Sequence, residues 1–426
     1  MVALITWRMS QGIVLLVVLG LTGVLHPLAA APPGWSVDLK KYGYQEWLNS
    51  RGLANSSQLH LAAARSVVAV GLGNPTDKTR GDERTGALPD ANWEISLLLF
   101  DPTTGKLNSK RGPWTGDMSF ELYSTSQGNL LLLLKHFHQA TAEVGETLYL
   151  LSPTGDELKQ IFLAPSIVNS TQTWSTFLVS PTGSSVLVAQ VLADGIRYKL
   201  LNADTLEMKS EWTSDASSTS PRVLAISDKG LLGHGASNLP HTTRPLGGDA
   251  KLYVGKFDGT WTPFTASLDA SHTGYGRFWI SNQLAFLSDD TIVGLSKKQD
   301  EANASLAVLR TDGTTVFSPT IPKLEPYTSL SGPVTVSQDG RYFAAGFTHR
   351  PWLSHLMLDV WKLDDAIMPE ELEFLVWPSS GPIAAAKFKP GGYLNADAFS
   401  LGFDDPPSLV FLSRSTLRLI RVQPLR

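Results

Sequence analysis

The feature that most constrains the fold of this chain is a hairpin that returns about every 50 residues. A short apolar strand runs into a polar turn, and a second apolar strand follows. The turn reads Ser-Pro-Thr-Gly at 180–183, Ser-Asp-Lys-Gly at 227–230 and Ser-Gln-Asp-Gly at 337–340, with degenerate copies at 124–128, 288–290 and 389–392. Proline presets φ, aspartate or serine bonds the backbone, and glycine tolerates positive φ. Short strands that recur in this way predict a radial β array.

Seven such units, each with room for four short strands, fit between Leu59 and Val422. We therefore predict an all-β fold, a seven-bladed β-propeller of four-stranded antiparallel blades. Six or eight blades also fit, because the first and fourth units are irregular, whereas a two-sheet β-sandwich would not need this regular return. The last unit has four candidate strands of its own between Ile383 and Val422. We expect it to close the ring without a strand from the N-terminal segment.

The N-terminus has the pattern of a secretory signal peptide. Arg8 precedes an apolar run from Gly12 to Leu25, and alanines follow at 29–31. We predict a signal peptide at 1–30, an N-terminal lead-in at 31–57 and a single propeller domain at 58–426. The apolar run is shorter than the roughly 20 residues that span a bilayer, so we expect no stable membrane span after cleavage.

Composition limits the partners and the compartment. The chain has no cysteine, and hence neither disulfides nor a lipid-modifiable cysteine, although export would permit disulfides. We expect an exported protein, periplasmic or secreted and of bacterial type, that is monomeric. Charged residues are only 17% of the chain, the net charge is -4, and basic residues do not cluster. We therefore expect no nucleic-acid partner.

The chain resembles the WD40-like and YVTN-type β-propeller repeat proteins. The resemblance is carried by the Ser-Pro-Thr-Gly turns and by the strand ends Leu-Phe-Asp-Pro-Thr-Thr-Gly at 99–105 and Leu-Asp-Val-Trp-Lys at 358–362. Neither the Gly-His nor the Trp-Asp dipeptide of the full WD40 signature recurs. What the resemblance implies is the fold and not an activity, since propellers host scaffolds, sugar and peptide binders, hydrolases and oxidases.

The predicted blades assign the loops to two faces. If the strands of each blade are labelled A to D from the centre outward, the A–B and C–D turns lie on one face, and the B–C loops and D–A connections lie on the other. The B–C loops are the long and variable ones, so we expect function on their face. We place these loops at 73–93, 135–145, 233–249, 296–303, 348–354 and 404–405.

Histidine, arginine and tryptophan side chains in these loops are the candidates for ligand binding. His136 and His138 would point the same way in a strand, a spacing that a metal site could use, but no acidic residue or cysteine stands at a supporting spacing. We interpret them as exposed histidines at a strand end and predict no metal. Arg350 and Trp352 could form a cationic and aromatic platform, or Trp352 could cover the rim between blades. The predicted ligand-binding set is His136, His138, His241, Arg244, His349, Arg350 and Trp352.

Enzyme signatures do not accumulate along the chain. No Gly-x-Ser-x-Gly elbow, His-Glu-x-x-His motif or phosphate-binding glycine loop is present, and we nominate no catalytic residue and no cofactor. The sequence favours an exported binding or scaffold protein that contacts a protein, peptide or glycan through the B–C loop face. The alternative is a hydrolase or lyase whose acidic and cationic residues converge at the channel mouth from different blades. A purely structural role is a third hypothesis.

Overall fold

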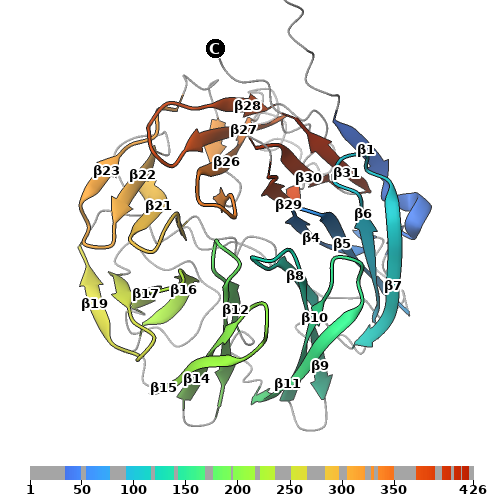
Figure 1. The fold of residues 1–426 in the computed structure, drawn as a ribbon, viewed down its shortest axis with the longest axis horizontal. Coiled ribbons are helices and arrows are strands. Elements are labelled where there is room, and N and C mark those ends of the chain that lie inside the picture. The colour runs from blue at the N-terminus through green and yellow to red at the C-terminus, as the bar shows by residue number, and fades with distance from the viewer. Residues whose placement is uncertain are drawn as a thin grey trace, which may run out of the picture. The chain divides into compact units, whose positions relative to one another are not determined.

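Seven antiparallel β-sheets form a ring of blades (Figure 1), and the chain is an all-β seven-bladed propeller, as the recurring hairpin predicts. The fold is the one that the resemblance to WD40-like repeat proteins implies. This computed structural model describes residues 34–48, 54–76, 93–116, 120–138, 143–167, 176–192, 195–215, 221–235, 251–265, 284–296, 305–321, 328–330, 334–349, 371–388, 396–403, 407–413 and 415–421. None of the helical segments within these ranges is long and apolar enough to cross a membrane.

The first five blades each use four consecutive strands, which run in order from innermost A to outermost D. Blade 1 contains β4 (Gln58–Ala64), β5 (Val67–Pro75), β6 (Trp93–Phe100) and β7 (Leu107–Gly116). Blade 2 contains β8 (Phe120–Ser124), β9 (Leu130–His138), β10 (Glu143–Leu151) and β11 (Glu157–Ile167). Blade 3 contains β12 (Thr176–Val179), β13 (Ser185–Val191), β14 (Gly195–Asn202) and β15 (Met208–Asp215). Blade 4 contains β16 (Arg222–Ile226), β17 (Leu231–Gly235), β18 (Lys251–Gly255) and β19 (Trp261–Phe264). Blade 5 contains β20 (Leu284–Phe286), β21 (Thr291–Ser296), β22 (Ser305–Arg310) and β23 (Thr315–Phe317).

Blade 6 has an interrupted inner strand. Both β24 (Thr328–Leu330) and β25 (Thr335–Val336) pair with β26 (Tyr342–His349), which is followed by β27 (Glu371–Pro378) and β28 (Ala386–Phe388). The sequence pattern assigns 383–388 to the last blade, and this assignment is wrong, because β28 pairs with β27 as the outermost strand of blade 6. A further predicted strand at 357–363 lies outside the described residues.

The last blade is completed by the N-terminal segment. It contains β29 (Ala396–Leu401), β30 (Leu409–Ser413) and β31 (Thr416–Ile420), and its outermost strand is β1 (Trp35–Asp38). The expectation that this blade closes the ring with its own four strands is therefore wrong. Because the last blade begins one strand later than predicted, the connection at 404–405 follows strand A and not strand B. Residues 404 and 405 themselves lie outside the described residues. The described ends of this A–B connection are joined by a hydrogen bond from Gly402 N–H to Ser408 O (2.8 Å).

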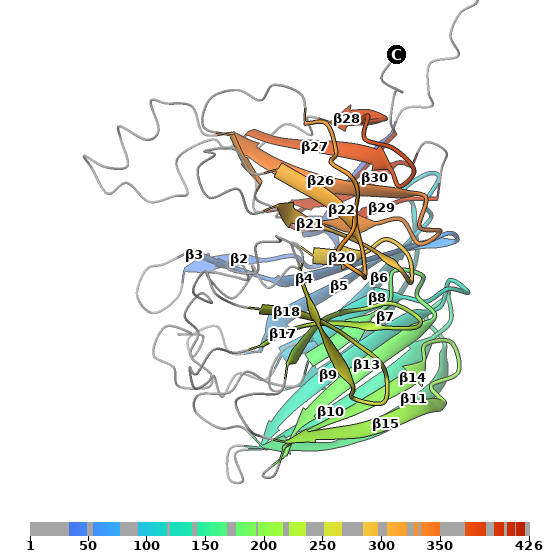
Figure 2. The ribbon, with the colours of Figure 1, turned by 90° about the vertical axis from the view of Figure 1, so that its left-hand side faces the viewer.

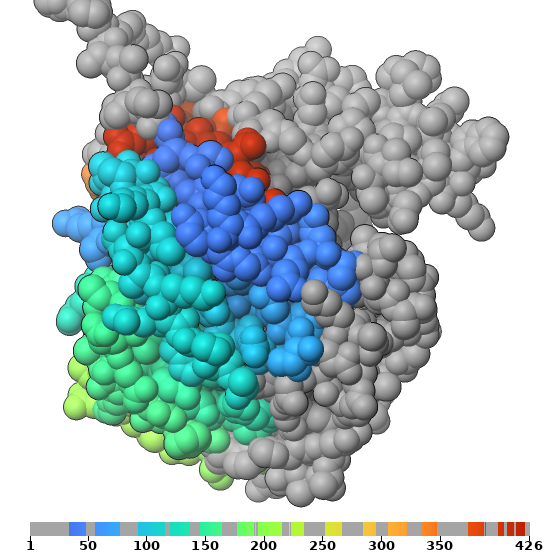
Figure 3. Space-filling model, turned by 90° about the vertical axis from the view of Figure 1, so that its right-hand side faces the viewer, coloured from blue at the N-terminus to red at the C-terminus, as the bar shows by residue number. Residues whose placement is uncertain are grey.

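Apolar and polar contacts hold this junction together. The indole Nε1 of Trp35 donates to the carbonyl of Pro102 in blade 1 (2.9 Å), and Leu39, fully buried, packs between blades 7 and 1. After β1 come the 3₁₀ helix η1 (Leu39–Tyr42) and a hairpin of β2 (Glu46–Leu48) and β3 (Ala54–Ser56). Figure 3 shows the N-terminal segment in blue between the red C-terminal strands and the cyan strands of blade 1.

Alternating side chains give each blade two apolar faces, one toward each neighbouring blade. In β9, Leu130, Leu132 and Leu134 join the core shared with blade 1, whereas Leu131 and Leu133 join the core shared with blade 3. The strand is therefore leucine-rich without alternation in its hydropathy. The same alternation of side chains decides which neighbouring blade the charged residues farther along β9 face.

The A–B and C–D turns lie on one face of the ring, as predicted, and they bond to one another. Asp204 in the C–D turn of blade 3 accepts hydrogen bonds from the hydroxyls of Thr125 and Ser126 in the A–B turn of blade 2. Thr182 and Asp228 connect the A–B turns of blades 3 and 4 (2.6 Å). We call this the turn face and the opposite one the loop face; Figure 2 shows the blades from the side.

Candidate functional site

The described structure locates only part of the predicted ligand-binding set. His136 and His138 lie at the end of β9, opposite Gly145 and Glu143 of β10, and His136 is half-buried. His349 is the last residue of β26 in blade 6. The remaining four, His241, Arg244, Arg350 and Trp352, lie outside the described residues, so a common site remains a prediction. Within the part of the chain that is described, no three His, Cys, Asp or Glu side chains are arranged to hold a metal ion.

A buried group of charged side chains lies in blade 2, on its side toward blade 3. Lys135 Nζ of β9 is 2.6 Å from Glu121 Oε1 of β8, and the Tyr123 hydroxyl donates to Glu121 Oε2 (2.7 Å). Glu146 of β10 is the direct cross-strand partner of Lys135. We call Glu121, Tyr123, Lys135 and Glu146 the charged cluster.

Strand alternation places this cluster between two blades. Lys135 follows Leu131 and Leu133 on the same side of β9, and Glu146 precedes Leu148 on the same side of β10. All three leucines belong to the core shared with blade 3. A lone ammonium buried there would cost several kcal/mol, so Lys135 needs its carboxylate partners.

Burial and charge shift the pKa values within the cluster in different directions. Burial raises the pKa of Glu146 to about 7, even though the positive charge of Lys135 acts to lower it. Burial would also raise the pKa of Glu121, but the charge and hydrogen bond of Lys135 hold it below its ordinary value. Burial would lower the pKa of Lys135, yet the two carboxylates keep it above its ordinary value. The ion pair of Glu121 and Lys135 is therefore charged, and Glu146 titrates near neutral pH.

The inner strand of blade 1, β4, presents polar groups to the other side of β8, away from the charged cluster. The ring of His60 packs on that of Phe120 at 4.7 Å between centroids, and burial lowers the pKa of His60 to about 4, so it is neutral at pH 7. Phe120 fits against β5 because Gly71 lacks a side chain, since a Cβ there would overlap its ring. Gln58 lies two residues before His60 and points the same way. Among the described residues, its Oε1 atom is buried and has no hydrogen-bond partner.

Glu121 and Tyr123 are partly exposed, whereas Lys135 and Glu146 are buried. The Glu121 side chain is 23% exposed, against 7% for Lys135, and Glu146 is only 2% exposed. Glu146 therefore cannot touch a substrate, and both oxygens of Glu121 are engaged by Lys135 and Tyr123. Because one carboxylate is buried and the other is already bonded through both oxygens, the two do not form an acid and base pair that flanks a scissile bond. The arrangement suits binding better than proton transfer.

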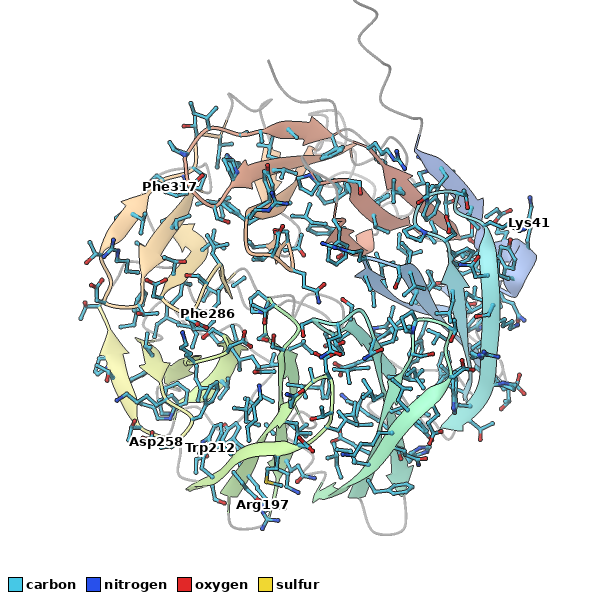
Figure 4. The ribbon with its side chains drawn as sticks, in the orientation of Figure 1. Lys41, Arg197, Trp212, Asp258, Phe286 and Phe317 are labelled. Atoms are coloured by element: carbon cyan, nitrogen blue, oxygen red, sulfur yellow. The ribbon has the colours of Figure 1, made fainter. Side chains whose placement is uncertain are left out.

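Sequence reasoning missed this cluster because its members are far apart in the chain. The sequence pattern places Lys135 at the start of a loop, whereas it is the sixth residue of β9. One signal was available: a lysine directly after five leucines, with no turn residue between them, indicates a strand that carries its charge into the core. Figure 4 shows the contrasting case of Arg197 in blade 3, which points away from the centre of the ring.

Comparison with known proteins adds structures but no family. The sequence matches no protein-family model and no curated protein. Similar solved structures include BamB from Moraxella catarrhalis (14% identity, 91% of this chain and 96% of that one, TM-score 0.35). The WD40 domain of Toxoplasma gondii coronin is 9% identical over 90% of this chain and 86% of its own (TM-score 0.43). A structure from a study of two prolyl endopeptidases is 10% identical over 90% of this chain and 48% of its own (TM-score 0.47). At these values the similarities say nothing about activity or residue roles.

Proposed function

We propose that this protein is an exported, non-enzymatic propeller that acts as a binding or scaffold protein and holds a protein, peptide or glycan through its loop face. The observation that supports this most is the difference between the two ends of the ring. At the turn face, the short turns of neighbouring blades hydrogen-bond to one another, as Thr182 does to Asp228. Toward the loop face, by contrast, the inner strands of blade 2 carry a buried ion pair, that of Glu121 with Lys135.

Export is supported by the signal-peptide pattern at 1–30 and by the place of β1, which begins only a few residues after the predicted cleavage site. Cleavage there would leave the strand that completes blade 7 intact. N-terminal sequencing of the protein recovered from its native compartment tests this part. A mature chain that begins within 35–38 would contradict the predicted cleavage site, because part of β1 would then be missing.

The binding role is tested by capture of partners from the envelope fraction of the source organism. The bait is the mature chain with a C-terminal tag, and each recovered protein is then tested for direct binding to the purified propeller. We compare the wild type with a loop-face variant (His349→Ala, Arg350→Ala, Trp352→Ala) and a turn-face control (Gln127→Ala, Lys229→Ala, Asp312→Ala), whose side chains are exposed. We expect the loop-face variant alone to lose the partner. Equal recovery by both variants would sink the proposal.

A further inference from the structure

We propose that the outer edge of blade 2, strand β11, binds an extended segment of a partner protein as an added strand, and that this segment carries apolar side chains at alternate positions followed by a basic residue. The surface lies at the rim of the ring and not on its loop face, so the inference goes beyond the proposed function and does not depend on it. It is carried by the free backbone edge, by two exposed apolar side chains and by the charges beside them.

The backbone of β11 offers a long free edge. It is the outermost strand of blade 2, and no other strand of the described residues pairs with its outer side (Figure 1). Alternate N–H and C=O groups along such an edge point away from the sheet and can bond to another extended chain. The outer strands of blades 4 to 7 have only three or four residues, whereas β11 has 11. Short outer strands protect a sheet edge, and blade 2 lacks this protection.

The other two long outer strands are protected by their composition. In blade 1, β7 contains Pro113, and in blade 3, β15 carries the exposed charges of Lys209 and Glu211. Proline and charged side chains hinder the addition of a strand. The stretch 159–163 of β11 pairs with β10 without a bulge, and its one charged group, the ammonium of Lys159, already donates to the carbonyl of Thr205 (2.8 Å). Among the long outer strands, β11 is therefore the one left open to another chain.

Two exposed apolar side chains stand on the same side of β11. Ile161 and Leu163 pack in the core shared with blade 3, so strand alternation turns Phe162 and Leu158 toward blade 1. Phe162 is 78% exposed and Leu158 is 55% exposed. A strand added to β11 would place its own side chains directly opposite these two and cover them. The side chains and the backbone of this edge thus call for the same kind of occupant.

A negative charge lies at the turn-face end of this edge. Burial, together with the nearby carboxylate of Glu157, raises the pKa of Tyr149, and Tyr149 contacts Trp114 of blade 1 (6.2 Å between ring centroids). Glu157 therefore lies on the side of β11 that faces blade 1, as the two exposed apolar side chains do. The adjacent Asp156 is paired with Arg111 (2.7 Å), but no basic side chain of the described residues pairs with the exposed Glu157. A basic residue is the complementary partner for this carboxylate.

These features specify the segment that fits. Antiparallel pairing is slightly more stable per residue than parallel pairing. Because β11 follows the C–D turn and runs toward the loop face, an antiparallel partner runs toward the turn face. It carries one apolar residue opposite Phe162, another opposite Leu158, and then a basic residue beside Glu157. Main-chain hydrogen bonds supply affinity in such a complex, and alternate side chains supply specificity.

The test uses the mature full chain and dye-labelled peptides, with fluorescence anisotropy as the readout. The probe is Ser-Phe-Thr-Val-Thr-Leu-Lys-Ser-amide, which has the required pattern. One control peptide has the same composition with its apolar residues adjacent, and another is methylated on its backbone nitrogens and cannot donate main-chain hydrogen bonds. A third, the glutamate peptide, replaces the lysine by glutamate. We expect saturable binding of the probe, no binding of the first two controls and weaker binding of the glutamate peptide.

Two variants of β11 make the test specific. Phe162→Ser should weaken binding of the probe about tenfold or more, because it removes the largest apolar contact. The matched control Met208→Ser, which changes a 54% exposed side chain on the outer strand of blade 3, should bind like the wild type. Glu157→Lys should reverse the preference, so that the glutamate peptide binds more tightly than the probe. If Phe162→Ser fails to fold, this exchange of charges decides.

Absence of saturable binding of the probe to the wild type, or equal affinity in Phe162→Ser, would overturn the inference. Sedimentation over a range of protein concentrations separates the other possible occupant. If the wild type binds no peptide but self-associates in a manner that Phe162→Ser abolishes, β11 takes a second copy of this chain and the inference is wrong. The two proposals fail separately, because the loop-face variant leaves β11 unchanged. Peptide binding at β11 with no partner captured through the loop face would leave only this inference standing, and the reverse result only the proposed function.

Discussion

Gln338 in the A–B turn of blade 6 donates a hydrogen bond from its side-chain Nε2 to the backbone carbonyl of Thr125 in blade 2, 2.6 Å away. Blades 2 and 6 are not neighbours, so this bond spans the centre of the ring, where Figure 1 shows the hairpins of blades 3 and 6 turned inward. Ser126 N–H also donates to the carbonyl of Gly183 in blade 3 (2.8 Å). Three blades are thus joined at one point of the turn face.

Gly183→Ala should disturb this junction. The glycine has φ +73°, and a Cβ there would lie 2.6 Å from Gln338 Nε2 and 2.8 Å from the backbone nitrogen of Ser126. We expect a loss of about 1–3 kcal/mol in the free energy of unfolding, measured by urea denaturation. Gly381→Ala is the matched control, because a Cβ at that position would meet nothing within 4 Å. Equal stability of the two variants would show that the junction does not restrain the ring.

A disulfide between Ser36→Cys and Arg418→Cys should lock the ring. These residues are direct partners in the register of β1 and β31, and the chain has no cysteine that could compete. Closing so long a loop should stabilise the protein by roughly 3–5 kcal/mol, seen as a rise in Tm that a reductant reverses. The pair Lys41→Cys and Arg418→Cys serves as control, since Lys41 lies in η1 beyond the strand. Failure of the first pair to oxidise would contradict the register.

Lys135→Met should be strongly destabilising, although methionine is apolar and the site is buried. The substitution leaves Glu121 and Glu146 without the ammonium between them, and breaking a buried ion pair costs about 3–5 kcal/mol. The triple variant Glu121→Gln, Lys135→Met, Glu146→Gln should recover most of this loss in thermal denaturation at pH 8. Lys110→Met, an exposed lysine on β7, provides the control and should change stability by no more than about 0.5 kcal/mol.

Glu146→Gln should change how stability depends on pH. The pKa of Glu146 is about 7 in the folded protein and ordinarily 4.5, so the unfolded chain loses this proton first as pH rises. The free energy of unfolding of the wild type therefore falls as the pH rises from 4.5 to 7, and above pH 7 the whole of this loss is present. The glutamine variant avoids this loss. Between pH 5 and pH 8, the free energy of unfolding of the variant should rise relative to that of the wild type by up to about 3 kcal/mol. An identical pH profile for the two proteins would refute the assignment.

The sequence was sufficient to predict the blades because the information lies in local turn chemistry. Ser180 to Gly183 reads as a turn in isolation, and the structure closes it with a bond from Gly183 N–H to Ser180 O (2.8 Å). The assignment to faces followed from strand alternation alone. Ring closure was not predictable in this way, because β1 is only four residues long and its partner β31 is at the other end of the chain. One misassigned strand then shifted the last blade.

The charged cluster depends on tertiary register, which the turns do not encode. Glu121 and Lys135 meet because β8 and β9 pair with Phe120 opposite Leu134, and a shift of one residue would turn Lys135 to the other face of the blade. The sequence pattern points instead to histidines and arginines in loops, where binding residues usually concentrate. A lysine within a strand is easily mistaken for the end of that strand.

The pairing of β1 with β31 also sets an order of events for a chain that emerges from its N-terminus. Trp35 has its partner at Leu419, so the first strand to appear is without one until almost the whole propeller has been made. Bringing these ends together closes a loop of about 380 residues, a contact of very high sequence separation. Until then the free edge of β31 is open to any other extended chain. Such a protein gains from being kept apart from its own copies while it folds.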